Sequence, residues 1–441
     1  GNLSVQQAIG TTNTTDAAIV LTAGKPTNAG TSSGGDVSMS GSGSLSTGTG
    51  GRATIYTGSL SGSTGLGIAT GNNRYNSDES STNYSAALGS GTYAIYREKP
   101  TITVLVNDAS KTYDGTTAIP TGPIAFVGNG LLANDRFTVS NVSGSFARAD
   151  AGTHAISFPG LVITTTDSSG KPVFGYRLDA SRITGSITPA TLAIIADALS
   201  IVYGTAVPAL TFTSRGFVGT DSASLLTGSL SRAPGLDAGR YAISLGTLSA
   251  SRNYNINFTG ADLVINKRAL SAALTGSITR VYDGTAAATL AANNYVLTGF
   301  ADGEGASVTR TQGVYDTKDV GTGKTVTAAL QPGDLTASGA TRLSNYVLPT
   351  TATGNIGSIT PATLAIIADA LSIVYGSAIP ALTFTSRGFV GTDSASLLTG
   401  SLTRAPGLDA GRYAIDLGTL SAGKNYTINY TGADLVINKS V

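Results

Sequence analysis

The fold is decided by the stretch SITPATLAIIADALSIVYG, residues 186–204, because residues 358–376 repeat it letter for letter. The match continues without a gap to residues 267 and 439. Only eight positions differ, and in the first copy they are Thr205, Val207, Ser231, Ser244, Ser251, Arg252, Asn255 and Phe258. Near-identical tandem units are typical of arrays that work through length and repetition. An enzyme needs one well-made pocket, whereas a stalk or fibre needs many similar modules.

The repeated unit has the texture of short β-strands. TLAIIA and SIVYG are extended segments, and NYNINF places Tyr254, Ile256 and Phe258 on one face with a period of two. The stretch TDSASLLTG, residues 220–228, interrupts this pattern. It predicts a helix of one or two turns with Asp221 as its N-cap. Strands, a short helix and further strands favour a β-grasp-like order over a pure sandwich, with an immunoglobulin-like module as the alternative.

A second, more divergent pair of units alternates with the repeated one. Each of these units carries a Tyr-Asp-Gly-Thr tetrapeptide and ends in GSITPATL. The predicted modules are therefore A (residues 100–189), B (190–268), A′ (269–361) and B′ (362–441), which follow a distinct N-terminal region (1–99).

The N-terminal region consists of short apolar alternations punctuated by glycine. In GGDVSMSGSGSLSTGTGG, residues 34–51, Val37 and Met39 are in phase and Leu45 continues that phase. Rungs of three to five residues turned by Gly and Ser predict the C-terminal end of a parallel β-helix, in which each coil stacks on the last. A flexible Gly/Ser linker is the alternative.

The composition bounds the class of protein. A chain of 441 residues is too long for one hydrophobic core, and strand formers interrupted by Gly, Asn and Asp predict several mostly-β domains. The net charge of +1 argues against a nucleic-acid partner, which needs a basic face. We expect no membrane span, because no apolar run reaches eighteen residues. Zero cysteine excludes a disulfide scaffold and a thiolate metal site.

The best local motifs are turns that contain tyrosine and glycine. Asp-Gly is a strong turn signal, because Gly adopts positive φ and Asp bonds the following backbone. A ligand or metal role for the aspartates is the alternative, but no ligand cluster lies nearby in the sequence. We interpret all these motifs as structural turns: Tyr113, Asp114 and Gly115 in A, Tyr282, Asp283 and Gly284 in A′, Tyr203 and Gly204 in B, and Tyr375 and Gly376 in B′.

Catalytic signals are weak, and we predict no enzyme, catalytic residue or cofactor. A Ser-His-Asp arrangement would depend on His154, for which A′ has Lys324 near the matching place, so a solvated strand residue is expected. Glutamate is too sparse for an acid/base pair. Calcium is the one metal left open, although no spacing matches a calcium loop. The aspartates that crowd the turns are Asp167, Asp221, Asp302, Asp316 and Asp319.

The modules resemble known domains. A and A′, with Tyr113-Asp114-Gly115 and Tyr282-Asp283-Gly284, resemble the YDG domain. B and B′ resemble the MBG domain of the YGX type through residues 201–204 and 373–376, both Ile-Val-Tyr-Gly. The N-terminal region resembles the end of a filamentous-haemagglutinin-type β-helix. This resemblance implies a large secreted bacterial surface protein that acts in adhesion or biofilm matrix, and it supplies no catalytic or binding residues.

We therefore expect an extracellular stalk segment, with a β-helix end followed by four β-rich modules in an elongated rod. Two alternatives remain. A binding module would use exposed tyrosines against host or bacterial glycans or matrix polysaccharide. A fibre subunit would self-associate through contacts between chains.

Overall fold

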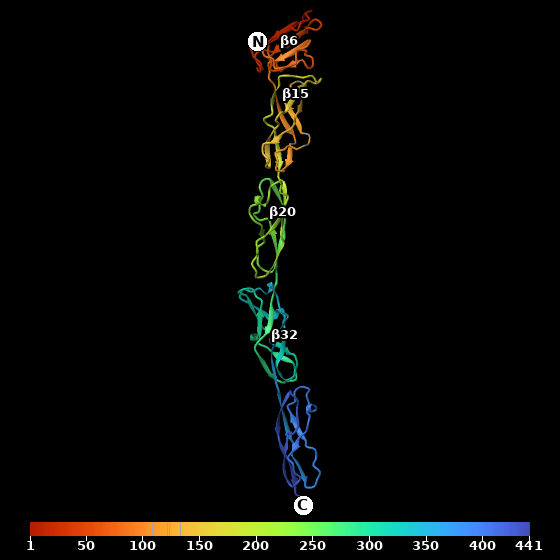
Figure 1. Ribbon diagram of the computed structural model, residues 1–441, viewed down its shortest axis with the longest axis vertical. Helices are drawn as coiled ribbons and strands as arrows, with labels where there is room; N and C mark the ends of the chain where they lie inside the picture. Colours follow the sequence, from red (N-terminus) through yellow and green to blue (C-terminus); the bar gives the residue numbers. More distant parts are fainter. Residues whose placement is uncertain (108, 121, 123, 133) are drawn as a thin grey trace. The chain divides into compact units, whose positions relative to one another are not determined.

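The computed structural model describes residues 1–107, 109–120, 122, 124–132 and 134–441. Its regular structure is β, and the longest helices in the described residues are 3₁₀ turns of three residues (Figure 1). The all-β prediction, with many small sheets in tandem, is therefore confirmed. Within the same residues, no helix has the length and apolar character needed to cross a membrane.

The chain divides into two compact units. Unit 1 comprises residues 1–195, 212–229 and 245–259, and unit 2 comprises residues 196–211, 230–244 and 260–441. The division runs through module B, so part of B belongs to each unit. Every contact described below lies within one unit.

The N-terminal region, in unit 1, pairs its strands in parallel. The strands β3 (Ile19–Thr22), β6 (Arg52–Thr57), β8 (Gly91–Tyr96) and β7 (Asn73–Arg74) form one parallel sheet. Two further parallel pairs are β1 (Leu3–Val5) with β4 (Val37–Met39) and β2 (Ile9–Gly10) with β5 (Leu45–Ser46). Val37 and Met39 are buried together with Ile55 and Tyr75, as their phase predicts. Parallel pairing of short strands is required for a β-helix, but the assignment to that fold stays a prediction.

Module A, also in unit 1, builds three small sheets. Their orders are β10-β17-β14-β13, β11-β9-β16 and β12-β15. The core between them buries Ile102, Phe146, Ile156 and Ile187. The strands are β9 (Thr101–Asn107), β10 (Ser110–Thr112), β11 (Ala125–Asn129), β12 (Arg136–Ser140), β13 (Ser145–Phe146), β14 (Gly152–Ser157), β15 (Val162–Thr166), β16 (Arg177–Asp179) and β17 (Thr184–Thr188).

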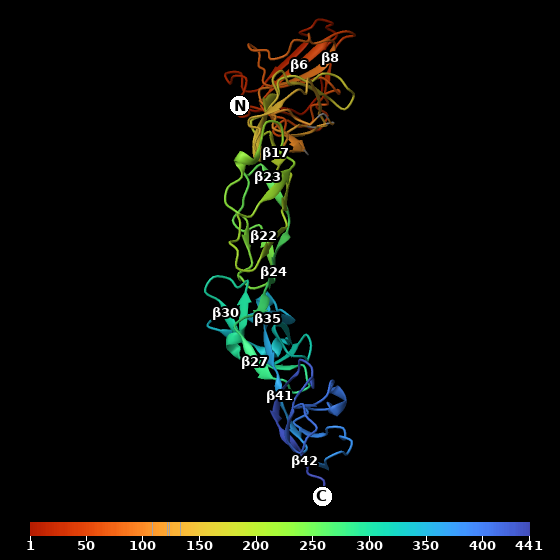
Figure 2. The same ribbon diagram turned by 60° about the horizontal axis from the view of Figure 1, so that its bottom comes forward.

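Module B contributes one sheet to each unit. In unit 1, β18 (Ala190–Ala196) lies parallel to β23 (Tyr254–Thr259) and next to β20 (Phe212–Arg215). In unit 2, β24 (Ala261–Asn266) lies between β19 (Leu199–Val202) and β22 (Gly239–Ser244), which is followed by β21 (Ser231–Arg232). Figure 2 shows β22 and β24 side by side. The predicted period of two in β23 is confirmed, because Tyr254, Ile256 and Phe258 are less exposed than the asparagines between them.

Module A′, in unit 2, has one larger sheet of order β28-β31-β32-β35-β26-β29, to which β27 adds beside β35. Its core buries Val326, Ala328 and Ile359. The strands are β25 (Arg268–Ala269), β26 (Ser271–Leu274), β27 (Ile278–Val281), β28 (Ala287–Thr289), β29 (Tyr295–Thr298), β30 (Gly305–Val308), β31 (Gln312–Tyr315), β32 (Gly321–Ala329), β33 (Leu335–Ser338), β34 (Tyr346–Val347) and β35 (Thr351–Thr360).

Module B′ lies wholly in unit 2 and repeats the strands of B. Its two sheets have the orders β38-β36-β41 and β37-β42-β40-β39. Alternate side chains of β36, among them Leu364 and Ile366, are fully buried with Leu435 from β42. The strands are β36 (Ala362–Ala368), β37 (Leu371–Val374), β38 (Phe384–Arg387), β39 (Thr403–Arg404), β40 (Gly411–Asp416), β41 (Tyr426–Thr431) and β42 (Ala433–Asn438).

The helix expected over residues 220–228 is reduced to one 3₁₀ turn, η1 (Ala223–Leu225). Its N-cap is Ser222, so the assignment of Asp221 as the cap is wrong. The chain returns to extended backbone at Leu226, and Thr227 pairs with Ser249. The β-grasp-like order depended on a helix that covers a sheet. Three residues are too few for that, and B′ packs two sheets instead.

Candidate functional site

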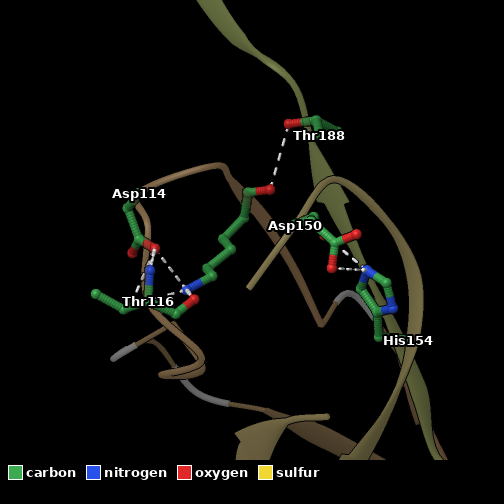
Figure 3. Close-up of polar contacts among 6 residues, drawn as sticks. Asp114, Thr116, Asp150, His154 and Thr188 are labelled. Atoms are coloured by element: carbon green, nitrogen blue, oxygen red, sulfur yellow. Dashed lines mark hydrogen bonds and ion pairs between the residues drawn. The ribbon is translucent and has the colours of Figure 1, made fainter. Parts of the chain in front are cut away.

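The Tyr-Asp-Gly turn of A follows β10. The carboxylate of Asp114 accepts hydrogen bonds from the amide and the hydroxyl of Thr116, each at 2.9 Å (Figure 3). Nζ of Lys111 donates to the same oxygen at 2.8 Å. Gly115 has a φ of 76°, which a residue without Cβ adopts freely. The Lys111 ammonium, together with the Thr116 donors, lowers the pKa of the Asp114 carboxyl to about 2.

The turn of A′ repeats this geometry with one exchange. Asp283 accepts from the Thr285 amide at 2.9 Å and from its hydroxyl at 2.8 Å, and Gly284 has a φ of 75°. Arg280 takes the place of Lys111 and donates to Asp283. In the described residues, the aspartate of each module bonds only to donors of its own turn and of the strand before it, which leaves the tyrosine as the group that reaches outward.

Tyr113 contacts module B. Its hydroxyl donates to Oδ2 of Asp221 at 3.0 Å, and the hydroxyl of Tyr254 donates to the same oxygen at 2.6 Å. The two rings meet edge to face, with centroids 5.5 Å apart and planes at 79°. The amide of Val218 donates to the Tyr254 hydroxyl at 2.9 Å. We call this arrangement a tyrosine–carboxylate clasp. In it, a tyrosine of the upstream module and a tyrosine of the downstream module both donate to one carboxylate of the downstream module. The backbone amide three residues before that carboxylate donates to the hydroxyl of the downstream tyrosine.

A second clasp joins A′ to B′. Tyr282 donates to Oδ2 of Asp393 at 2.9 Å, and Tyr426 donates to the same oxygen at 2.8 Å. The rings are again edge to face, 5.5 Å apart at 78°, and the Val390 amide donates to the Tyr426 hydroxyl at 2.9 Å. Tyr282 is 3% exposed, and Asp393 is half-buried.

A third clasp joins B to A′ and uses glutamate. Tyr203 donates to Oε1 of Glu304 at 2.5 Å, and Tyr346 donates to Oε2 at 2.5 Å. The rings lie 5.4 Å apart at 80°, and the Ala301 amide donates to the Tyr346 hydroxyl at 3.0 Å. The longer side chain offers one oxygen to each tyrosine, whereas aspartate offers one oxygen to both.

A fourth clasp joins the N-terminal region to A. Tyr176 donates to Oδ2 of Asp135 at 2.7 Å, and Tyr75 reaches the same oxygen at 3.4 Å. The Leu132 amide donates to the Tyr176 hydroxyl at 2.9 Å, and the rings are 5.1 Å apart. The two tyrosines, the carboxylate and the amide of the clasp therefore recur at the junction between the N-terminal region, which has no Tyr-Asp-Gly motif, and module A.

An asparagine adds a second contact beside three of the clasps. Asn253 accepts from the Ala151 amide at 2.8 Å, and Asn425 accepts from the Val320 amide at 2.9 Å. Asn345 accepts from the Ala238 amide at 2.8 Å and donates to Asp237 at 2.8 Å. Each asparagine immediately precedes the downstream tyrosine, so one short segment supplies both anchors.

The tyrosine hydroxyls keep their protons. Burial, and then the hydrogen bond to the carboxylate, raises the pKa of Tyr254 and that of Tyr282 to about 12. The hydrogen bond to Glu304 is the main cause that raises the pKa of Tyr203. At neutral pH the hydroxyls of Tyr254, Tyr282 and Tyr203 are therefore neutral hydrogen-bond donors. The chemistry of the clasp is therefore cohesion between modules.

His154 and four of the five aspartates considered for calcium, Asp302 being the exception, have partners within the described residues. His154 lies in β14 as expected, but its side chain is only 11% exposed, with Nε2 2.6 Å from the Asp150 carbonyl oxygen (Figure 3). The solvated side chain expected there is thus corrected, because the ring folds back onto the preceding turn. Asp316 pairs with Lys324, and Asp319 accepts from Asn425. Within the described ranges, no group of three His, Cys, Asp or Glu side chains is placed to hold a metal ion.

Comparison with known families matches all four modules. Residues 97–170 and 266–354 match the YDG domain, and residues 192–264 and 364–436 match the MBG domain of the YGX type. The chain alternates YDG and MBG domains. Domains of these two kinds occur in bacterial surface adhesin-like repeat proteins, and neither is an enzymatic family. A and A′ are therefore the YDG modules, and B and B′ are the MBG modules.

Solved structures show only a faint likeness. The protocadherin GammaB4 extracellular domain is 9% identical, over 80% of this chain and 69% of that chain, with a TM-score of 0.18. The four N-terminal immunoglobulin domains of Dscam1 isoform 7.44 are 9% identical, over 78% of this chain and 98% of that chain, with a TM-score of 0.17. Scores this low carry no argument. The comparison with curated proteins gave no match.

The sequence pointed to part of the clasps. Tyr113, Tyr282 and Tyr203 were singled out as turn residues, and each is an upstream tyrosine of a clasp. The downstream members were missed, among them Asp221, which was assigned to a helix cap. A usable signal exists: in each clasp the amide that donates to the downstream tyrosine lies three residues before the carboxylate, and that tyrosine follows the carboxylate by 33 to 42 residues: Asp135 and Tyr176, Asp221 and Tyr254, Glu304 and Tyr346, and Asp393 and Tyr426.

Proposed function

We propose that this chain is a stalk segment of a large secreted bacterial surface adhesin of the filamentous-haemagglutinin type. It would stand on the outside of the cell and act in cell adhesion or in a biofilm matrix. The alternating YDG and MBG domains support this assignment, because such domains occur in adhesin-like repeat proteins. The parallel strand pairing of the N-terminal region supports its interpretation as the end of a β-helix.

The observation that carries the proposal is the recurrence of one clasp at successive junctions. A flexible string of domains needs only a soluble linker between folded modules. Here each of these three junctions packs two aromatic rings edge to face on a shared carboxylate, which restricts bending between neighbours. A stalk that must hold a binding part away from the cell requires that restriction, whereas a catalytic or scavenging protein does not.

The proposal is tested by electron microscopy of the purified chain beside a variant in which Tyr113, Tyr203 and Tyr282 are all changed to Ala. We expect a narrow distribution of end-to-end distances for the natural chain and a broader one for the variant. Circular dichroism of both proteins checks that the modules remain folded. Equally broad distributions in the two proteins would contradict the stalk assignment.

Two alternatives give different outcomes. A polysaccharide-binding module would retain matrix sugars on a column and lose them when the exposed Tyr375 is changed to Ala. A fibre subunit would form polymers whose size rises with protein concentration in sedimentation. The stalk assignment predicts neither behaviour for this segment.

A further inference from the structure

The end of B′ carries a surface that B uses to hold A′. In unit 2, Ile201, Tyr203 and Leu236 of B line a hollow of about 390 Å³, and Ala301 and Glu304 of A′ line its other side. In B′ the matching residues, Ile373, Tyr375 and Leu408, line a hollow of about 260 Å³. We call the surface formed by Tyr375, Leu408, Asp409 and Ala410 the Tyr375 face.

The Tyr375 face has the geometry of its counterpart in B. The hydroxyl of Tyr413 donates to the Asp409 carbonyl at 2.8 Å, as Tyr241 does to the Asp237 carbonyl at 2.8 Å. Arg404 donates to the Gly407 carbonyl at 2.8 Å, and Arg232 donates to the Gly235 carbonyl at the same distance. The loop is therefore set by contacts inside the module, and binding would require little additional ordering.

The two copies differ where A′ makes its contacts. Tyr203, Asp237 and Ala238 are half-buried in B, because Glu304 and Asn345 cover them. Tyr375, Asp409 and Ala410 are exposed in B′, and Tyr375 is 53% exposed. The eight substitutions between the copies change none of these three positions. By analogy with B, the Tyr375 face lacks two partners. One is a carboxylate to accept from the Tyr375 hydroxyl, and the other is an amide side chain to donate to Asp409 and accept from the Ala410 N–H.

We propose that the Tyr375 face binds a YDG-type module that presents a glutamate, a tyrosine and an asparagine in the arrangement of Glu304, Tyr346 and Asn345. The same surface on B binds that set, and its residues are unchanged on B′. A second copy of this chain fits less well, because its own Glu304 and Tyr346 already hold Tyr203. The proposal is independent of the adhesive role, since it concerns only which module this surface accepts.

The test extends the full chain with a second copy of residues 268–361 joined directly after Lys439, which reproduces the link between Lys267 and Arg268. Hydrogen exchange is then measured for the peptides that contain Ala238 and Ala410. These peptides differ in mass, because Ser231 and Ser244 of B are replaced by Thr403 and Asp416 in B′. We expect the Ala410 amide to exchange freely in the natural chain and to become as protected as the Ala238 amide in the extended chain.

A matched control changes to Ala, in the added segment only, the asparagine that corresponds to Asn345. Protection of the Ala410 amide should then be lost, while the Ala238 amide is unaffected. An unprotected Ala410 amide in the extended chain would overturn the proposal, and so would an added module that fails to fold after B′.

A second arm asks whether two chains bind each other. Sedimentation of the natural chain should give a monomer at every concentration. Concentration-dependent association that disappears in the Tyr375→Ala variant would assign the face to a second copy of the chain and overturn the YDG-type assignment.

Discussion

The two YDG modules have diverged widely, whereas the two MBG modules differ at only eight positions, yet both pairs build the same clasps. In the diverged pair, Tyr113 and Tyr282 keep the same partners, Asp221 and Asp393. The near-identity of the MBG copies is therefore explained by recent duplication, and it does not show which residues the structure requires. What the diverged YDG modules retain identifies the groups that the junction requires.

The YDG modules also show how much freedom the junction allows. On the side where they receive an upstream tyrosine, A uses Asp135 and A′ uses Glu304. The residue and its loop differ, but the amide three residues earlier and the second tyrosine are the same. The clasp is thus a constraint on geometry and charge, and not on one residue type.

The largest effect is expected from removing the downstream tyrosine of an MBG module. Tyr254 and Tyr426 are each 6% exposed, and each packs against two other rings. Tyr254→Ala and Tyr426→Ala should each lower the free energy of unfolding by about 3–5 kcal/mol, because both leave a cavity and unpaired polar groups. Urea unfolding of the full chain measures this change. Tyr375→Ala is the control and should change stability by less than about 0.5 kcal/mol. Unequal losses of unfolding free energy in Tyr254→Ala and Tyr426→Ala would show that the A–B and A′–B′ junctions are not equivalent.

Removing the carboxylate should have a smaller effect that does not depend on its identity. Asp221→Ala, Asp393→Ala and Glu304→Ala each leave two tyrosine hydroxyls without an acceptor, which costs about 1–3 kcal/mol. The three variants can be compared by the midpoint of urea unfolding. If Glu304→Ala left the unfolding midpoint unchanged while Asp221→Ala lowered it, the junctions held by glutamate and by aspartate would differ in kind.

Removing a single hydroxyl separates the two MBG ends. Tyr203→Phe should cost about 1 kcal/mol, since it loses one hydrogen bond to a carboxylate but keeps the ring. Tyr375→Phe should lie within about 0.5 kcal/mol of the natural chain, because that hydroxyl is on an exposed residue. Equal losses at the two positions would mean that the Glu304 contact contributes nothing measurable.

The smallest effect is expected from pH. The pKa of Tyr254 and that of Tyr282 rise from 10.0 to about 12 in the folded chain, so folding favours the protonated hydroxyl. This contribution to stability is complete below pH 10, and it falls as the pH rises through the window from 10 to 12. Denaturant midpoints at a series of alkaline pH values should fall faster for the natural chain than for the Tyr254→Phe variant. If the denaturant midpoints of the two proteins fell equally with pH, the raised pKa of Tyr254 would be contradicted.

Local patterns predicted much of the fold. The period of two in residues 253–258 predicted β23, and the phase of Val37 and Met39 predicted their burial. The Asp-Gly turns of both YDG modules have the positive φ and the side-chain bonds that the tetrapeptide implies. Each of these features is decided by residues a few positions apart, so the sequence shows them directly.

The failure at Asp221 has a physical cause. As a local signal, an aspartate before a short apolar patch is a good helix cap. In the folded chain its carboxylate accepts from Tyr113, 108 residues earlier, and from Tyr254, 33 residues later. Two charge-assisted hydrogen bonds outweigh one bond to a helix amide, and the segment forms only a three-residue turn.

The sequence by itself determined the modules of this protein: their number and order, their all-β character, and the turns and strand faces within each one. Those properties follow from short-range periodicity and from backbone preferences. The tertiary structure alone decided how neighbours are held, because the upstream tyrosine of a clasp bonds to a carboxylate up to 111 residues away. No local pattern carries that pairing, since it exists only when folded modules bring the three side chains together.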